Sequence, residues 1–321
     1  LLPAASPLMY EVGKIFGAVI LAPSVGYQIG GIKLPGFGMG IHGLVYGVII
    51  GAVLHLLIQV PGLLKYKFKW TPSINLRDES VQKVLRLMGP RLVSMIFIQL
   101  IFVAQDNLAS RLEVGALTAL TFGWWIQQVP QTMIGTAIAT ALLPTLSDHL
   151  AVGDESAFKE TIERSLRVLI ALSLPIGVIL SLTTLPLIQT AFGFTVEDSR
   201  MILFATQAFL AGLLGHNIVD LGVRSFYAKQ NARTPTFISA AGFIVYLGTA
   251  ILLMGVMSYR GIALANSISY SLQALTLVLL LRRGIPGNFR LNNSFIRGML
   301  SATLAGVCAW LIISGLSLPL P

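Results

Sequence analysis

The sequence is poor in charged residues. Only 11% of its 321 residues are Asp, Glu, Lys or Arg, whereas an average soluble domain has about 25%. Apolar residues make up 55% of the chain, and the mean hydropathy is +0.80. A water-soluble fold has no use for so much apolar surface, but a lipid bilayer solvates it. We therefore expect an all-α integral membrane protein.

Cysteine and catalytic motifs are also scarce. The single cysteine, Cys308, excludes a disulfide within the chain and a cysteine-based metal site. The sequence has no P-loop, no His, Asp and Glu cluster at metal-ligand spacing, and no nucleophile paired with a base. We expect a protein that is not an enzyme and uses no cofactor.

The net charge of +9 would suggest a nucleic-acid partner in a soluble protein. No basic and aromatic nucleic-acid motif accompanies it, and anionic lipid headgroups account for it more simply. The chain starts at Leu1-Leu2-Pro3, without an initiator Met, a charged n-region or a signal cleavage pattern. We expect it to be a fragment of a longer protein.

Nine segments are long and apolar enough to span a bilayer, which takes about 20 residues. They are roughly residues 3–25, 37–64, 82–110, 115–146, 165–191, 199–228, 235–257, 260–282 and 294–317. Between the fourth and fifth segments, residues 148–164 predict a short amphipathic cytoplasmic helix, with a break at Gly153-Asp154 before it.

Seventeen of the 22 Lys and Arg residues lie in or beside alternate gaps between these segments. They are Lys65, Lys67, Lys69, Arg77, Lys83, Arg86, Arg91, Lys159, Arg164, Arg167, Arg224, Lys229, Arg233, Arg282, Arg283, Arg290 and Arg297. Cytoplasmic loops carry such an excess because positive residues resist translocation. The pattern places the chain start and the gaps after the second, fourth, sixth and eighth segments in the cytoplasm, and the chain end outside.

Ionisable residues inside a span are candidates for function, because each costs about 2.5–3.5 kcal/mol on insertion scales. Glu11 and Lys14 can pair on one helix face, as a self-neutralising structural pair or as a substrate contact. Asp106 lies near the outer end of its helix, where an interfacial position competes with a functional one. Arg91 follows Gly89-Pro90 and is either a phosphate ligand or a positive anchor at the cytoplasmic surface.

Asp220 and Arg224 stand four residues apart, with His216 one turn earlier. They form a polar stripe on an apolar helix, and we favour a cavity-facing stripe over a packed structural pair. Trp124-Trp125 and Gln127-Gln128 enter another helix near the outer face. Trp125 and Gln128 therefore either belong to the aromatic belt or line a cavity for a sugar.

Four stretches resemble the MurJ/MviN family, the lipid II flippases of the multidrug/oligosaccharidyl-lipid/polysaccharide exporter superfamily. They are LRLMGPRL (85–92), QDNLAS (105–110), GTAIATALLPTLS (135–147) and RSFYAKQNARTP (224–235). Their order and spacing agree with the family along nearly the whole chain. A weak internal repeat, in which residues 43–57 resemble residues 261–275, fits parallel halves of such a transporter.

The resemblance implies part of a two-lobed exporter bundle with about nine transmembrane helices. Residues 1–64 would be the last two helices of the N-lobe, and residues 65–83 a cytoplasmic loop. Residues 84–283 would form the six-helix C-lobe, and residues 284–321 an additional helix.

The resemblance also implies a function and its partners. A family member carries undecaprenyl-diphosphate-linked peptidoglycan precursor across the bacterial cytoplasmic membrane by alternating access. A cationic cavity would hold the diphosphate, and a groove in the C-lobe would take the polyprenyl tail. The expected partners are this lipid-linked glycan, the membrane lipids and the cell-wall synthesis machinery.

The sequence departs from the family in two places. The first two family helices, with their cavity arginines, are absent from the chain. An Asp-Arg pair and a later acidic residue are replaced by Trp124, Trp125 and Gln128, before Pro130. Either another residue, such as Arg224 or Arg91, replaces the lost cation, or the substrate differs, or the protein is a divergent paralogue. The alternatives are an exporter of another polyprenyl-linked saccharide or a small molecule, a membrane scaffold and, least favoured, a membrane glycosyltransferase.

Overall fold

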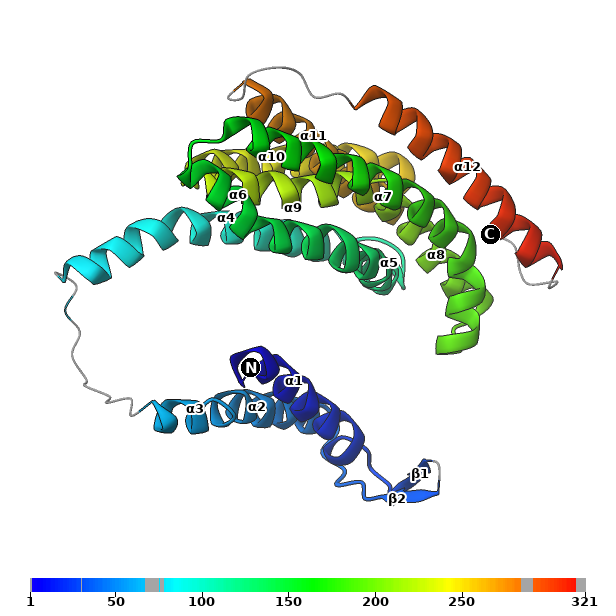
Figure 1. Ribbon diagram of the computed structural model, residues 1–321. Helices are drawn as coiled ribbons and strands as arrows, with labels where there is room; N and C mark the ends of the chain where they lie inside the picture. The colour runs from blue at the N-terminus through cyan, green and yellow to red at the C-terminus, as the bar shows by residue number, and fades with distance from the viewer. Residues whose placement is uncertain (1, 30, 67–74, 76–77, 284–290, 316–321) are drawn as a thin grey trace. The chain divides into compact units, whose positions relative to one another are not determined.

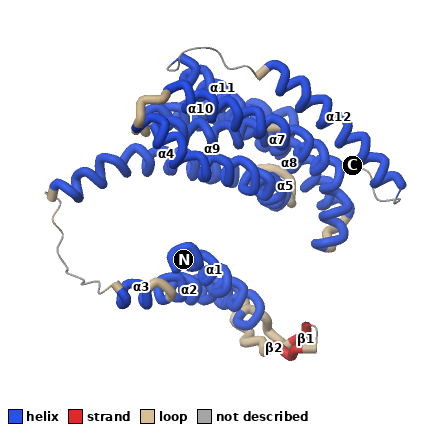
Figure 2. The backbone as a smooth tube through the Cα atoms, viewed as in Figure 1, coloured by secondary structure: helices blue, strands red, loops and turns tan. Residues whose placement is uncertain are grey.

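The computed structural model describes residues 2–29, 31–66, 75, 78–283 and 291–315. Within these residues the chain is almost wholly helical, as Figure 2 shows, and this confirms the predicted fold class. Two compact units, Leu1–Leu76 and Arg77–Pro321, make up the chain. Each unit has its own set of packed helices.

Unit 1 is a pair of helices packed through glycine. Its elements are α1 (Leu2–Phe16), the π-helical turn η1 (Gly17–Leu21), β1 (Tyr27–Ile29), β2 (Ile32–Leu34), α2 (Ile41–Leu57) and α3 (Val60–Lys65). Gly13 and Gly17 face Gly43, Gly47 and Gly51, and a Cβ at Gly17 would lie 2.6 Å from the Gly47 Cα. Small residues at this spacing let two membrane helices approach closely.

A short hairpin joins the two long helices of unit 1. β1 and β2 pair antiparallel, with Tyr27 opposite Leu34, and Gly31 adopts a positive φ of 88° in the turn. These strands were not predicted from the sequence. Three residues per strand are too few for an alternating apolar pattern to show.

Unit 2 is a bundle of longer helices that lie along one another (Figure 1). They are α4 (Glu79–Ala109), α5 (Ala116–Pro130), η2 (Gln131–Thr136), α6 (Ala137–Ala151), α7 (Glu155–Phe192), α8 (Val196–Leu210), α9 (Leu213–Ala228), α10 (Arg233–Met257), α11 (Tyr259–Arg283) and α12 (Asn292–Gly315). The pairs α10–α11, α7–α12, α5–α8 and α9–α11 pack closely.

Glycine also brings α9 against α11. A Cβ at Gly212 would lie 2.6 Å from the Ser267 Cα, and a Cβ at Gly215 would lie 3.0 Å from the Ser271 Cα. The Ser267 hydroxyl donates to the Ala208 carbonyl at 2.6 Å, next to the break between α8 and α9. Close backbone contact and interhelical hydrogen bonds therefore hold the centre of the bundle, as is usual where lipid removes the hydrophobic drive.

All nine predicted segments are helical, but they do not give nine straight spans. Among the described residues, seven helices are long and apolar enough to cross a membrane. The predicted segment 199–228 is α8 and α9, bent by 44° at their junction, and makes an eighth if counted as one span. The predicted segment 3–25 is α1 followed by η1, and it is not among the seven.

The prediction of a separate helix at residues 148–164 was wrong. α6 continues to Ala151, and α7 begins at Glu155 and runs without interruption into the apolar span. The predicted break is present, because Gly153 has a positive φ of 74° and Asp154 caps α7 by accepting from the Ala157 amide at 2.8 Å. A Glu163–Arg167 ion pair, one turn apart, supports the polar start of α7.

Two contacts group four of the described connections of unit 2 into two pairs. At one end the Ser258 hydroxyl, between α10 and α11, donates to the Glu113 carboxylate between α4 and α5, at 2.7 Å. At the other end Lys229, after α9, lies 5.2 Å over the ring of Phe158, near the start of α7. The gaps rich in Lys and Arg and the gaps poor in them therefore alternate between the two ends.

Candidate functional site

Unit 2 contains a partly open polar cavity of about 460 Å³. Side chains from α4, α5, η2, α6, α9, α10 and α11 line it, so it lies within the bundle. Among the described lining residues, the charged ones are Asp220 and Arg224 on α9, and the neutral polar ones include Gln128, Gln131, Ser239 and Tyr270.

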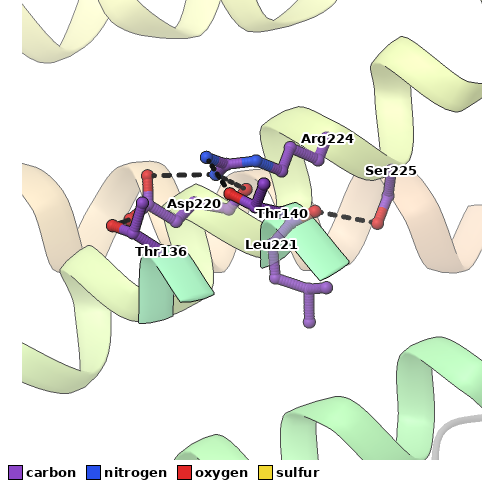
Figure 3. Close-up of polar contacts among 6 residues, drawn as sticks. All are labelled: Thr136, Thr140, Asp220, Leu221, Arg224 and Ser225. Atoms are coloured by element: carbon purple, nitrogen blue, oxygen red, sulfur yellow. Dashed lines mark hydrogen bonds and ion pairs between the residues drawn. The ribbon is translucent and has the colours of Figure 1, made fainter. Parts of the chain in front are cut away.

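Two threonines on the neighbouring segments η2 and α6 hold Asp220 and Arg224 (Figure 3). The Thr136 hydroxyl donates to the Asp220 carboxylate at 2.8 Å, and Arg224 Nη2 donates to the Thr140 hydroxyl at 3.0 Å. Arg224 Nη1 lies 3.6 Å from Asp220 Oδ1 and donates to the Asp220 main-chain oxygen at 3.3 Å. Each charged group thus already has partners within the protein.

A proline and a π-helical segment shape the part of the chain that holds the threonines. Pro130 lacks an amide hydrogen, and its ring crowds the preceding turn of a helix. α5 passes there into η2, a wider-wound segment that continues into α6. Gly135 in η2 allows close approach to α9, since a Cβ at this position would lie 2.2 Å from Asn217 Oδ1.

Aromatic rings and amides form the wall of the cavity around His216. The His216 ring stacks on Tyr270 with centroids 3.7 Å apart, and Trp124 meets the His216 ring edge-on at 5.5 Å. His216 Nε2 lies 3.0 Å from Asn266 Oδ1, within hydrogen-bond distance. This wall therefore carries rings and neutral polar groups.

The structure brings some of the predicted site residues together. Asp220, Arg224 and Gln128 all line the cavity, and so does His216 from the predicted stripe. Trp125 does not line it: this residue is 55% exposed and packs on Phe122, with centroids 5.3 Å apart. The preceding residue, Trp124, takes the place in the cavity wall.

The structure does not place the other predicted site residues at the cavity. Asp106 is exposed near the end of α4 and is not part of the cavity. Arg91 lies within α4, but its side chain is outside the described part of the structure. Glu11 and Lys14 form an ion pair of 2.7 Å on α1 of unit 1, where the Glu11 side chain is 57% and the Lys14 side chain 39% exposed.

Four residues of the site were not predicted from the sequence: Thr136, Thr140, Ser239 and Tyr270. Thr136 and Thr140 are spaced by one helical turn within a stretch that carried the family resemblance, so they could have been noted. Nothing in the local sequence distinguishes Ser239 or Tyr270 from other polar residues in apolar helices. Only the packing of α10 and α11 places them on the cavity.

A second cavity, of about 470 Å³, is mostly apolar. α7, α9 and α11 line it together with Phe295 from the start of α12, and Arg282 lies among the lining residues. Its long aliphatic side chains, such as those of Ile170 and Leu279, offer a surface suited to a hydrocarbon chain.

Comparison with known proteins identifies the family. The family model described as "Lipid II flippase MurJ" matches residues 1–318. The lipid II flippase MurJ of Burkholderia cenocepacia is 30% identical over 325 residues, covering 98% of this chain and 60% of the relative. The probable lipid II flippase MurJ of Haemophilus influenzae is 26% identical, covering 95% of this chain and 59% of the relative. The chain thus spans about three fifths of these relatives.

Solved structures show the same fold. "Lipid II flippase MurJ, inward closed conformation" matches with a TM-score of 0.69 at 18% identity, covering 98% of this chain and 67% of that one. The Vibrio cholerae MATE transporter VcmN in the bent form matches with a TM-score of 0.55 at 16% identity, covering 84% of this chain and 58% of that one. With the family model matching nearly the whole chain, the chain belongs to the lipid II flippase MurJ family.

Proposed function

We propose that the whole protein is a flippase that moves undecaprenyl-diphosphate-linked peptidoglycan precursor, lipid II, across the bacterial cytoplasmic membrane by alternating access. Membership of the family supports this proposal. The observation that carries it is the polar cavity inside unit 2, with Asp220 and Arg224 on its wall. Charged residues within a membrane bundle are costly, and they usually mark a substrate or ion pathway.

We assign the two cavities to different parts of the lipid. The polar head would pass through the cavity beside α9, where hydrogen-bonding groups replace water. The polyprenyl tail would lie in the apolar cavity lined by α7, α9, α11 and Phe295, as the resemblance implies. This division suits a molecule with a polar head and a long hydrocarbon chain.

The assignment of the chain to the family's parts is also a proposal. Residues 1–64 would complete the N-lobe, residues 84–283 would form the C-lobe, and α12 would be the additional helix. The packing of α1 on α2 in unit 1 and of α10 on α11 in unit 2 supports the repeat, because each pair is a closely packed neighbour pair.

One observation supports a second candidate, an exporter of another polyprenyl-linked saccharide or a small molecule. Where the family has an Asp-Arg pair and a later acidic residue, this chain has Trp124, Trp125 and Gln128. Trp124 packs edge-on against Phe102 and Phe209, so this part of the wall is aromatic. A site of this kind favours a different head group from one lined by an arginine.

Complementation tests the main proposal. The whole protein is expressed in a bacterium depleted of its own lipid II flippase, and growth and lipid II accessibility at the outer surface are measured. We expect growth and accessibility to be restored. Continued growth failure, with verified expression and membrane insertion, would contradict the proposal and favour the second candidate.

A further inference from the structure

We propose that the polar cavity of unit 2 binds the saccharide part of the translocated lipid and not its diphosphate. This inference rests on the proposed function and names the part of the substrate that this site receives. Three features of the cavity support it: its charges, its free hydrogen-bonding groups and its aromatic surface.

Among the residues that the structure describes, the charges that line the cavity offer little to an anion. Asp220 and Arg224 together carry no net charge, and each is already held by a threonine of η2 or α6. A diphosphate at Arg224 would approach the carboxylate of Asp220, 3.6 Å from the guanidinium. The two negative groups, diphosphate and carboxylate, would repel each other. Arg224 would also have to give up its present partners to bind the diphosphate, so the net gain in binding free energy would be small.

Neutral groups on the same wall are free to bind a ligand. The Gln128 amide and the hydroxyls of Ser239 and Tyr270 make no hydrogen bond to any residue that the structure describes. Gln131 accepts one bond, from Gln127 at 3.3 Å, through its Oε1 atom. Its Nε2 atom makes no bond within the described part of the chain.

Aromatic rings supply the remaining surface. Trp124, Phe102 and Tyr270 line the cavity from three different helices, α5, α4 and α11. Sugars combine hydroxyl and amide groups with apolar C–H faces, so neutral donors and acceptors beside aromatic rings match them on both counts. A diphosphate can accept hydrogen bonds from such donors, but it has no apolar face for the rings, and its negative charge has no unpaired cation among the described lining residues. The geometry therefore points to an uncharged, polyhydroxylated head group.

Binding to two probes tests the proposal. The purified whole protein is titrated with undecaprenyl-diphosphate-linked disaccharide-pentapeptide and with undecaprenyl diphosphate, for the unchanged protein, Gln128→Leu and Ser239→Ala. Gln189→Leu on α7, outside the cavity, is the matched control. Ser239→Ala removes only a hydroxyl, so it keeps the test valid if Gln128→Leu fails to fold.

We expect each cavity variant to bind the saccharide-bearing probe about fivefold to tenfold more weakly, the loss of about one neutral hydrogen bond. Affinity for undecaprenyl diphosphate should change by less than about twofold. Equal loss for both probes, or no loss for either, would overturn the proposal. So would Arg224→Gln if it weakened undecaprenyl diphosphate binding more than about fivefold.

The two proposals fail in different ways. If complementation fails but the cavity variants still separate the two probes, the saccharide site stands and the flippase function does not. If complementation succeeds and the variants weaken both probes equally, the flippase function stands and the saccharide site is refuted.

Discussion

At the scale of single residues, the sequence predicts a charged pair but not its surroundings. Asp220 and Arg224 lie one helical turn apart, so their proximity follows from the spacing alone. Thr136 and Thr140 precede them by 84 residues each, and only the packing of η2 and α6 on α9 brings them close. Local spacing therefore identifies half of this network, and tertiary packing supplies the rest.

Removing one member of the pair should impair transport. In the whole protein, Asp220→Ala leaves Arg224 without its carboxylate, and Arg224→Ala leaves Asp220 without its guanidinium, each in a partly buried position. We expect either change to lower stability by about 1–3 kcal/mol and to reduce transport clearly. Lipid II accessibility and thermal unfolding measure the two effects.

The controls for this prediction are Lys65→Ala, at the end of α3, and the double variant without either charge. Lys65→Ala should have little effect. The double variant should be less destabilised than the sum of the single variants, because it leaves no unpaired charge. Equal and negligible effects of Asp220→Ala, Arg224→Ala and Lys65→Ala would show that the pair has no role in transport.

A glycine in η2 should tolerate no side chain. At Gly135 an added Cβ would lie 2.2 Å from Asn217 Oδ1, and Asn217 is fixed by a hydrogen bond of 2.7 Å to the Ser173 hydroxyl. We expect Gly135→Ala to destabilise the protein by about 1–3 kcal/mol through overpacking. Thermal unfolding in detergent measures this. Gly248→Ala, where a Cβ meets open space, is the control, and equal shifts in the two variants would refute the explanation.

At the scale of elements, apolar length predicts where helices are but not where they bend. The predicted segment 199–228 is a bent pair, and 115–146 contains the π-helical η2 after Pro130. Pro130 is visible in the sequence, but the kind of distortion depends on how α9 packs beside it. The start of α7 was predicted as a separate helix for another reason. Its residues are polar, and an apolar count ends the span at the bilayer edge without showing that the same helix extends beyond it.

The glycine face between α1 and α2 should be sensitive to size. Gly47→Leu would force a large side chain into a contact where even a Cβ lies 2.6 Å from the Gly17 Cα. We expect the two helices to separate or shift, with a loss of about 1–3 kcal/mol or more. Val45→Ala, on an exposed part of α2, is the control. Protease sensitivity of unit 1 within the whole protein measures the change, and unchanged sensitivity of Gly47→Leu would contradict the prediction.

At the scale of the whole molecule, the alternating charges and the structure agree on which connections of unit 2 share an end. The Glu113–Ser258 contact joins two connections that are poor in Lys and Arg. Gly115 lies beside Met201 near the start of α8, since a Cβ there would meet the Met201 sulfur at 3.5 Å. These contacts show which connections lie at the same end of unit 2. Which end faces the cytoplasm remains a prediction from the charge bias.

Cysteine labelling tests that orientation. In the whole protein lacking other cysteines, single cysteines are introduced at Val114, which is 101% exposed between α4 and α5, and at Val152, which is 77% exposed between α6 and α7. Because Lys and Arg gather near Val152, we expect a membrane-impermeant thiol reagent on intact cells to label Val114→Cys and not Val152→Cys. Both should be labelled after the membrane is permeabilised, which controls for reactivity. The reverse pattern in intact cells would invert the orientation and remove the charge argument for it, while leaving the packing of the bundle unchanged.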